Sequence, residues 1–212
     1  MTIPFIAVEG PIGVGKSTLS KAISDTQQFH LLMEIVDENP FLNKFYDDIA
    51  EWSFQTEMFF LCNRYKQLGD IQKHYLAAGK PVVADYHIFK NLIFAKRSLS
   101  DSDYAKYEQI YSILTAGMPV PNVIVYLHAS LETLMKRIAM RGRDYERGMD
   151  PAYLRRLSAD YETFIDEFEQ QHPDIPVLRF NGDELDFVAN SRDRDYILNA
   201  VQAAIQKEGV NP

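Results

Sequence analysis

Residues 10–17 read GPIGVGKS, which matches the phosphate-loop pattern GxxxxGK[ST] at every fixed position. An apolar run over residues 3–8, expected to form a buried strand, precedes the loop, and a helix-forming run over residues 17–24 follows it. A glycine loop between a strand and a helix start gathers backbone N–H groups at the positive end of the helix dipole, where anions bind. The stretch therefore predicts a site for a nucleoside triphosphate with magnesium.

Each residue type in this loop has an expected task. The glycines let the backbone approach phosphate closely, Lys16 is expected to reach the outer phosphates, and Ser17 is expected to ligate Mg²⁺. The residues predicted to bind the donor nucleotide from this loop are Gly10, Gly13, Val14, Gly15, Lys16, Ser17 and Thr18.

Composition narrows the class of protein. The chain has 212 residues, a net charge of −8 and a single cysteine, Cys62. The acidic balance argues against a nucleic-acid or anionic-membrane surface, and no apolar stretch approaches the roughly 18 residues that a membrane span needs. One cysteine excludes an internal disulfide, and the chain enters its first strand without room for a secretory signal, so we expect a cytoplasmic protein. We expect Cys62 and Trp52 to be core residues.

Apolar strand-like runs alternate with helix-like segments along the whole chain. The strand-like runs cover residues 3–8, 31–36, 81–85, 123–128 and 177–180, and the helix-like segments cover residues 17–24, 49–77, 102–116, 131–139, 151–170 and 193–206. This alternation predicts an α/β fold with a parallel sheet covered on both faces. Ligands of such sheets bind outside the carboxyl ends of the strands.

Two carboxylates are expected at those carboxyl ends. Glu34 lies in the last part of the second strand-like run, and Asp85 closes the third. Phosphoryl transfer needs positioning, charge neutralisation and a group that accepts the proton of the attacking hydroxyl. Glu34 is the candidate base, and Asp85 is the candidate that holds magnesium or its water shell together with Ser17. Asp37 and Glu38 are expected to face solvent.

A basic cluster near residue 140 resembles the lid of a small-molecule kinase. Gly142 and Gly148 bracket a short polar segment between two helical runs. Such a lid closes over the reactants, excludes water and places arginines on the transferring phosphoryl group. The cluster consists of Lys136, Arg137, Arg141, Arg143 and Arg147.

The helical run over residues 52–64 carries a carboxylate and a guanidinium among aromatic residues. Phe54, Met58 and Leu61 follow the spacing of a core stripe, and Glu57 and Arg64 lie on nearly the same face. The pair suits recognition of a flat ring with polar edges. Periodicity alone favours a charge pair within the helix or on the surface, so both interpretations stand at this point.

Together these motifs resemble the deoxycytidine/deoxyguanosine kinase family of deoxynucleoside kinases, and within it the bacterial deoxyguanosine and deoxyadenosine kinases. The resemblance spans the chain and rests on GPIGVGKST at 10–18, EIVDENPFLNKFY at 34–46, EWSFQTEMFFLCNRYKQL at 51–68, DYH at 85–87, RGRDYERG at 141–148 and DF at 186–187. It implies one domain over residues 1–212, a P-loop kinase fold with a five-stranded parallel sheet, a lid at about 137–150 and a homodimer. It also implies transfer of the γ-phosphate of ATP to the 5′-hydroxyl of a deoxynucleoside.

The resemblance also implies roles for single residues. The family base falls on Glu34, and the two groups that contact the 3′-hydroxyl of the acceptor fall on Tyr46 and Glu146. The lid arginines fall on Arg137, Arg141 and Arg143. The loop that holds the donor base falls on Asp186 and Phe187.

One departure from the family concerns the acceptor base. The family usually has a Gln five residues after the Trp of the WSF segment, and this chain has Glu57 there. A carboxylate offers only acceptors, which matches the N1–H and amino donors of guanine and opposes the ring acceptor of adenine or cytosine. A buried mismatch of about 1–3 kcal/mol discriminates by roughly tenfold to a few hundredfold. Glu57 therefore predicts deoxyguanosine, with Arg64 as a further donor to the base.

A second departure lies at residues 85–87. The family commonly reads Glu/Asp-Arg-Ser, and here Tyr86 stands in place of the arginine. Its task falls to Arg64, His87 or Lys90, and the sequence does not choose among them. Asn91 replaces an Asp that contacts the base in many relatives. Tyr86, Lys90 and Asn91 are retained as candidate substrate-binding residues.

Three alternatives stay open. A deoxyadenosine or deoxycytidine kinase would share this loop chemistry. A nucleoside monophosphate kinase would need additional cations at the acceptor phosphate, whereas residues 41–68 are rich in aromatic and acidic side chains. A non-catalytic nucleotide sensor of the GTPase kind would carry an N-K-x-D loop, and the segment at residues 43–46 lacks the Asp.

Overall fold

The computed structural model describes residues 3–36, 38–146 and 148–207. Within these residues five strands form one parallel sheet in the order β2-β3-β1-β4-β5. The strands are β1 (Phe5–Glu9), β2 (His30–Leu32), β3 (Val82–Ala84), β4 (Val123–His128) and β5 (Val177–Asn181). The predicted α/β fold with a five-stranded parallel sheet is confirmed.

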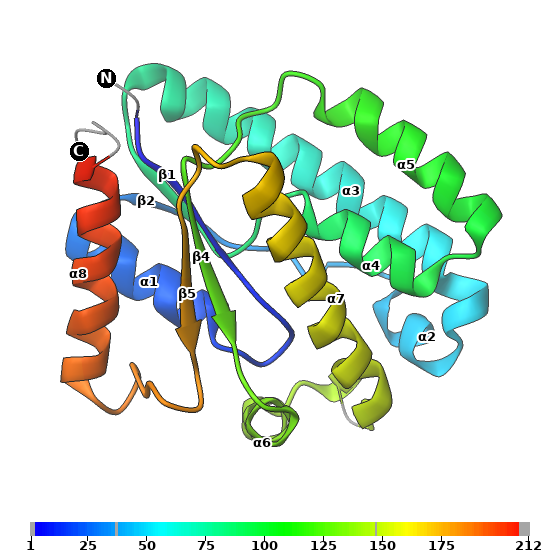
Figure 1. The fold of residues 1–212 in the computed structure, drawn as a ribbon. Coiled ribbons are helices and arrows are strands. Elements are labelled where there is room, and N and C mark those ends of the chain that lie inside the picture. Colours follow the sequence, from blue (N-terminus) through cyan, green and yellow to red (C-terminus); the bar gives the residue numbers. More distant parts are fainter. Residues whose placement is uncertain (1–2, 37, 147, 208–212) are drawn as a thin grey trace.

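Helices cover both faces of the sheet (Figure 1). Helices α1 (Lys16–Gln27) and α8 (Ser191–Lys207) lie on one face, and α3 (Ile49–His74), α4 (Lys90–Ser98), α5 (Asp101–Thr115) and α7 (Pro151–Gln171) lie on the other. Helix α6 (Leu131–Arg141) lies beyond the carboxyl ends of β4 and β5, and α2 (Leu42–Asp47) packs beside α3. Two short 3₁₀ helices, η1 (Leu76–Ala78) and η2 (Asp144–Glu146), complete the described helices.

The centre of the sheet is buried because helices cover it on both sides. Every residue of β1 and β3 is buried, as the near-continuous apolar runs of a two-sided parallel sheet require. Helix starts are fixed by side-chain caps: Ser100, Ser130 and Asp150 accept hydrogen bonds from the first turns of α5, α6 and α7. Because β2, β3 and β1 are parallel neighbours, the segments that follow them lie together at the carboxyl ends of the strands.

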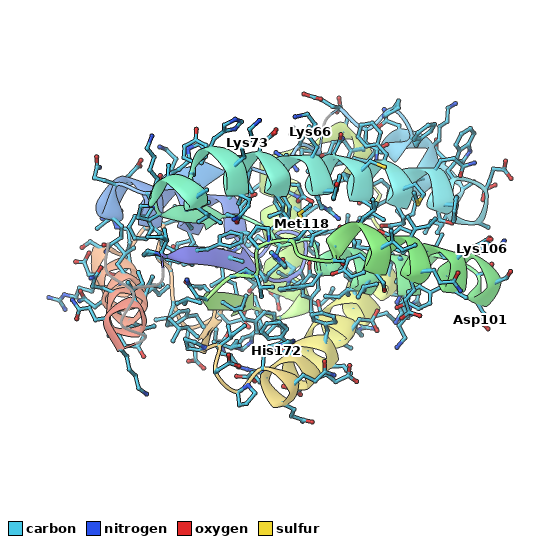
Figure 2. The ribbon with its side chains drawn as sticks, turned by 90° about the horizontal axis from the view of Figure 1, so that it is seen from above. Lys66, Lys73, Asp101, Lys106, Met118 and His172 are labelled. Atoms are coloured by element: carbon cyan, nitrogen blue, oxygen red, sulfur yellow. The ribbon has the colours of Figure 1, made fainter. Side chains whose placement is uncertain are left out.

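Helix α3 crosses the molecule and runs beside α5 (Figure 2). Lys66 and Lys73 extend from its solvent face, away from α5. Its buried face is unusually polar, because besides Leu61, Leu68 and Ile71 it contains Ser53, Thr56, Glu57 and Arg64. A polar face turned inward on a long helix is the first sign that a ligand site lies beneath it.

The structure corrects several sequence-based expectations. Strand β2 ends at Leu32, so Glu34 lies in the loop after the strand rather than on it. Helices α2 and α4 were not expected at all. Cys62 is exposed and Trp52 is only half-buried, so the expectation that both are core residues is wrong. Glu38 is exposed as expected, whereas Asp37 lies outside the described residues.

Candidate active site

The phosphate loop joins β1 to α1. Gly10, Gly13 and Gly15 have φ values of 143°, 85° and 109°, a backbone conformation that glycine adopts without strain. A Cβ on Gly13 would lie 2.9 Å from the carbonyl oxygen of Leu134, so the loop is also too tightly packed for a side chain there. Helix α1 starts at Lys16, which places the helix N-terminus at the loop.

A cavity of about 880 Å³ opens beside this loop, within the size range of small-molecule sites. It brings together most of the residues that the sequence predicts for the site. The predicted residues that line it are Gly13, Val14, Gly15, Lys16, Ser17, Thr18, Glu34, Tyr46, Glu57, Arg64, Asp85, Lys90, Arg137, Arg141, Arg143, Glu146, Asp186 and Phe187.

Three predicted residues do not line the cavity. Gly10 lies at the base of the loop, where its carbonyl oxygen accepts a hydrogen bond of 2.7 Å from Nζ of Lys16. The Tyr86 side chain is fully buried and donates to Oε1 of Gln67 at 2.6 Å. Asn91 is also fully buried, and its Oδ1 accepts a hydrogen bond of 2.6 Å from Nη1 of Arg64. The structure therefore does not place Tyr86 or Asn91 in contact with a ligand in this cavity.

Glu34 is held by two cations. Lys90 Nζ lies 3.0 and 2.9 Å from its two carboxylate oxygens, and Arg64 donates to the same carboxylate through Nε at 3.1 Å and through Nη2. These positive charges keep the pKa of Glu34 well below its usual range despite its burial, which acts in the opposite direction. The Glu34 side chain is therefore ionised, and its carboxylate is held in one orientation. One of the two cations, Lys90, comes from helix α4, which the sequence analysis did not predict.

Arg64 is itself fixed by a second layer of polar groups. Its Nη1 donates to Oδ1 of Asn91 at 2.6 Å, and the Asn91 amide donates to the hydroxyl of Tyr107 at 2.6 Å. Arg64 is 4 % exposed, so these bonds leave little freedom to the guanidinium. The sequence offered no signal for Tyr107, because its role depends on the packing of α5 against α3.

Of the three residues expected to take over from the family arginine, Lys90 and Arg64 contact Glu34. His87 is buried, and Nε2 of its ring lies 3.2 Å from the carbonyl oxygen of Pro119, outside the cavity. Burial lowers the pKa of His87 to about 4, so the imidazole is neutral at pH 7. A neutral side chain turned away from Glu34 does not replace an arginine, whereas Lys90 and Arg64 both contact the carboxylate.

Ser17 and Asp85 form the candidate metal site. The Ser17 hydroxyl donates to Oδ2 of Asp85 at 2.6 Å, and Oδ1 of Asp85 accepts from the backbone N–H of Glu34 at 2.7 Å. Among the described residues no three His, Cys, Asp or Glu side chains gather as a metal cage. A hydroxyl and one carboxylate suit Mg²⁺, which usually keeps several waters and takes further ligands from substrate phosphates.

Glu9 is a polar residue of the site region that sequence reasoning missed. It ends β1 immediately before the phosphate loop, is fully buried and accepts a 2.6 Å hydrogen bond from the backbone N–H of His87. Burial raises the pKa of Glu9 to about 7 and lowers the pKa of Lys16 to about 8. The signal that the sequence offered for Glu9 was a charged residue at the end of an otherwise apolar strand.

Away from the phosphate loop, the cavity is lined by a carboxylate with one oxygen that accepts no hydrogen bond in the described structure. Glu57 is 2 % exposed, and its Oε1 accepts a 3.3 Å hydrogen bond from the Ser98 hydroxyl. Oε2 of Glu57 and Oγ1 of Thr56 have no hydrogen-bond partner in the described structure. Phe60 and Phe94 line the same end. Aromatic walls with free buried acceptors suit a flat ring that carries N–H donors.

The arginines predicted for the lid have different surroundings. Arg137 donates to the carbonyl oxygens of Val14 and Gly182, both at 2.9 Å, so it links the phosphate loop to the loop after β5. Arg141 donates to both carboxylate oxygens of Glu146, through Nε at 3.1 Å and through Nη2. The guanidinium of Arg143 lies 5.7 Å from the centre of the Tyr145 ring. Arg147 lies outside the described residues.

Tyr46 and the loop after β5 close the two remaining sides. The ring of Tyr46 stacks with that of Tyr145 at a centroid distance of 6.3 Å, next to Glu146. Phe187 is buried, and its ring packs against the phosphate loop at Gly15. The packing is so close that a Cβ on Gly15 would lie 2.9 Å from the ring. Asp186 accepts from the backbone N–H groups of Val188 and Ala189, which shapes this loop.

A phosphate loop, a fixed carboxylate and a basic segment that line one cavity define a P-loop kinase acting on a small molecule. The model of the family described as deoxynucleoside kinase matches residues 6–206. The chain belongs to the deoxynucleoside kinase family and is a kinase of deoxynucleosides.

Individual relatives support this assignment. The chain is 51 % identical to the deoxyguanosine kinase of Bacillus subtilis over 96 % of its own length and 99 % of the relative. It is 33 % identical to the deoxyadenosine/deoxycytidine kinase of the same organism, over 94 % of this chain and 92 % of the relative. The solved structure of deoxyadenosine kinase from M. mycoides with bound dATP has a TM-score of 0.80 and 27 % identity, covering 94 % of this chain and 99 % of that one.

No helix in the described part of the chain combines the length and the apolar character that crossing a membrane requires.

Proposed function

We propose that this kinase transfers the γ-phosphate of ATP to the 5′-hydroxyl of deoxyguanosine. The observation that carries the choice of base is Glu57, a buried carboxylate at the end of the cavity with one oxygen free of hydrogen bonds. The identity to a deoxyguanosine kinase supports the same choice.

The argument for guanine depends on the pattern of donors and acceptors. The N1–H and the amino group of guanine are adjacent donors, and an ionised carboxylate accepts from both. Adenine places an acceptor where guanine has N1–H, so it would set a lone pair against a carboxylate oxygen. An unmatched buried pair costs about 1–3 kcal/mol, which corresponds to a preference of roughly tenfold to a few hundredfold.

The reacting end of the cavity supports the transfer itself. Glu34, ionised and held by Lys90 and Arg64, accepts the proton of the 5′-hydroxyl as that oxygen attacks the γ-phosphorus. Lys16 and the loop N–H groups bind the outer phosphates of the donor. Ser17 and Asp85 would hold Mg²⁺, which neutralises charge on the phosphates.

The sugar lies between these two ends. We assign the 3′-hydroxyl contacts to Tyr46 and Glu146, and the lid to residues 137–150. The ion pair between Arg141 and Glu146 connects a lid arginine with this sugar contact. Closure of the lid would then depend on the correct sugar as well as on the donor.

A phosphoryl-transfer assay tests this function. The purified protein is supplied with Mg-ATP and each of the four common deoxynucleosides, with guanosine alongside, and the monophosphate products are quantified. The largest kcat/KM is expected for deoxyguanosine. A preference for deoxyadenosine or deoxycytidine would refute the assignment of the base and leave the kinase activity. Transfer to none of them would refute the proposal as a whole.

Glu57→Gln is the matched variant for the base. It keeps the size of the side chain and replaces one acceptor by a donor. The ratio of kcat/KM for deoxyguanosine to that for deoxyadenosine is expected to fall at least about tenfold. An unchanged ratio would show that another group selects the base.

A homodimer in the cytoplasm completes the proposal. The dimer is supported by the family resemblance, and the reducing compartment by the single cysteine, Cys62, which is exposed as a free thiol. Light scattering coupled to gel filtration is expected to give twice the 24.4 kDa mass of the chain. A mass of one chain at micromolar concentration would contradict the dimer.

A further inference from the structure

The Glu57 carboxyl has no ion-pair partner among the described residues. Arg64, about two turns further along the same face of α3, is engaged with Glu34 and Asn91, and Lys90 on α4 is engaged with Glu34. In the described structure the Ser98 hydroxyl donates a hydrogen bond to Oε1 of this carboxyl group. The titratable and charged groups that act on it from the packed elements are Glu34 after β2, Tyr46 on α2, Arg64 on α3, Lys90 on α4, Tyr107 on α5 and Tyr153 on α7.

We propose that Glu57 selects the acceptor base through its own protonation, taking deoxyguanosine as a carboxylate and deoxyadenosine as a neutral carboxyl group. This inference rests on the proposed function, since it concerns the same base-binding end of the cavity. It adds that a single site has two specificities, and that pH chooses between them.

The hydrogen-bond pattern explains the exchange. The carboxylate presents two acceptors, which pair with N1–H and the amino group of guanine. The protonated carboxyl presents one donor and one acceptor, which pair with N1 and the amino group of adenine. The same proton that creates the match to adenine removes one acceptor from guanine. The only bond that forms or breaks is the O–H bond of the Glu57 carboxyl group, whose proton comes from or returns to the solvent.

The environment of Glu57 places this exchange near neutrality. Burial raises the pKa of Glu57 to about 7, and the attraction of Arg64 and the Ser98 hydrogen bond reduce the effect only in part. Binding of guanine donors would stabilise the ionised form, so deoxyguanosine releases a proton on binding below the pKa. Binding of adenine would stabilise the neutral form, so deoxyadenosine takes up a proton above it.

The ratio of two kcat/KM values isolates this effect. Ionisations of Lys16, Glu34 or the phosphates act on both substrates and cancel in the ratio of deoxyguanosine to deoxyadenosine. If each base needs its own form of one carboxyl group, the ratio rises about tenfold for each pH unit. We expect this slope between about pH 6 and pH 8.5 for the unmodified protein and a flat ratio for Glu57→Gln.

A binding measurement gives an independent readout. Titration calorimetry of deoxyguanosine, without donor nucleotide, is run at about pH 6.5 in buffers of different ionisation enthalpy. Release of roughly half a proton or more is expected, and deoxyadenosine at about pH 8 is expected to take up a comparable fraction. This measurement uses the unmodified protein, so it does not depend on the folding of the variant.

The outcomes separate the two proposals. Phosphorylation of deoxyguanosine with a flat ratio and no proton exchange would overturn this inference and leave the proposed function standing. A failure to phosphorylate either nucleoside, with ATP still bound, would overturn both. A rising ratio in the unmodified protein that persists in Glu57→Gln would assign the switch to another group and overturn the role of Glu57.

Discussion

Nζ of Lys90 lies 3.0 and 2.9 Å from the two carboxylate oxygens of Glu34, and Arg64 reaches the same carboxylate from helix α3. Lys90 and Glu34 are 56 positions apart in the chain, and both are almost fully removed from solvent. Two cations on one carboxylate leave a net positive charge among these three side chains. In the proposed reaction this pair would orient Glu34 as the base and would also favour the arriving phosphoryl group.

Removal of Lys90 tests this double role. Lys90→Ala is expected to lower kcat by roughly 10- to 1000-fold, because it removes a charge close to the transferring phosphoryl group. Lys90→Arg keeps the charge and is expected to recover part of the loss. Steady-state kinetics, with circular dichroism to confirm folding, measure both. Lys96→Ala, an exposed position on the same helix, is the control and should leave kcat unchanged. An unchanged kcat in Lys90→Ala would contradict the role.

The packing of Gly13 predicts that the phosphate loop tolerates no side chain there. In Gly13→Ala the new Cβ would meet the Leu134 carbonyl oxygen at 2.9 Å in a backbone conformation of positive φ. We expect ATP affinity, measured by calorimetry, to fall at least about tenfold. Gly69→Ala in helix α3 has open space and should raise stability by about 0.5–1 kcal/mol. Equal ATP affinity in both variants would refute the prediction.

Arg137 is expected to position the phosphate loop rather than to act on the phosphoryl group alone. Its two 2.9 Å hydrogen bonds go to the Val14 and Gly182 carbonyls. In Arg137→Ala the KM for ATP should rise about tenfold, as both loops lose a charged hydrogen-bond donor. Arg155→Ala, exposed on α7, serves as the control. A loss confined to kcat would instead place Arg137 on the transferring phosphoryl group.

Glu57 should make stability depend on pH. Its folded-state pKa of about 7 lies above the ordinary value of 4.5, so the folded chain binds the proton more tightly and loses stability as pH rises from about 4.5 to 7. Gln does not titrate, so Glu57→Gln should gain stability over the unmodified protein by on the order of 3 kcal/mol across that range. Urea unfolding at several pH values measures the difference. A difference independent of pH would contradict it.

Deoxyinosine should separate the two hydrogen bonds of the guanine edge. Hypoxanthine keeps N1–H but lacks the amino group, so one carboxylate oxygen of Glu57 would be left unmatched. The kcat/KM for deoxyinosine is expected to lie roughly 10- to 100-fold below that for deoxyguanosine. Equal values in the same assay would show that Glu57 does not contact the amino group.

The sheet and the phosphate loop were predictable because they depend on local patterns. Continuous apolar runs separated by helical segments predicted the five strands, and the loop follows from fixed glycine spacing. Helix α4 was not predictable in this way. Its buried face contains Lys90 and Asn91 beside Ile93 and Ala95, so the apolar period that marks a helix is broken by a residue that contacts Glu34 and one that supports Arg64.

Helix α3 shows the same limit in another form. Phe54 and Met58 follow a core spacing, yet both are only half-buried, whereas Thr56 and Glu57 face inward. Periodicity counts apolar residues, and a helix that lines a ligand cavity turns polar residues inward. Cys62 and Trp52 were misplaced for this reason. The choice of Lys90 and Arg64 over His87 required the distances to Glu34, which no pattern in the sequence provides.

Arg137 donates a hydrogen bond to the carbonyl oxygen of Val14, which lies 123 positions earlier in the chain. Phe187, which packs against Gly15, lies even further along the chain. On the ribosome the phosphate loop therefore emerges long before the side chains that hold it in shape. A nascent chain halted before Phe187 would display the complete GPIGVGKS motif without a working nucleotide site. We therefore expect nucleotide binding to begin late in synthesis, and nucleotide to stabilise only chains that already extend beyond β5 to Phe187.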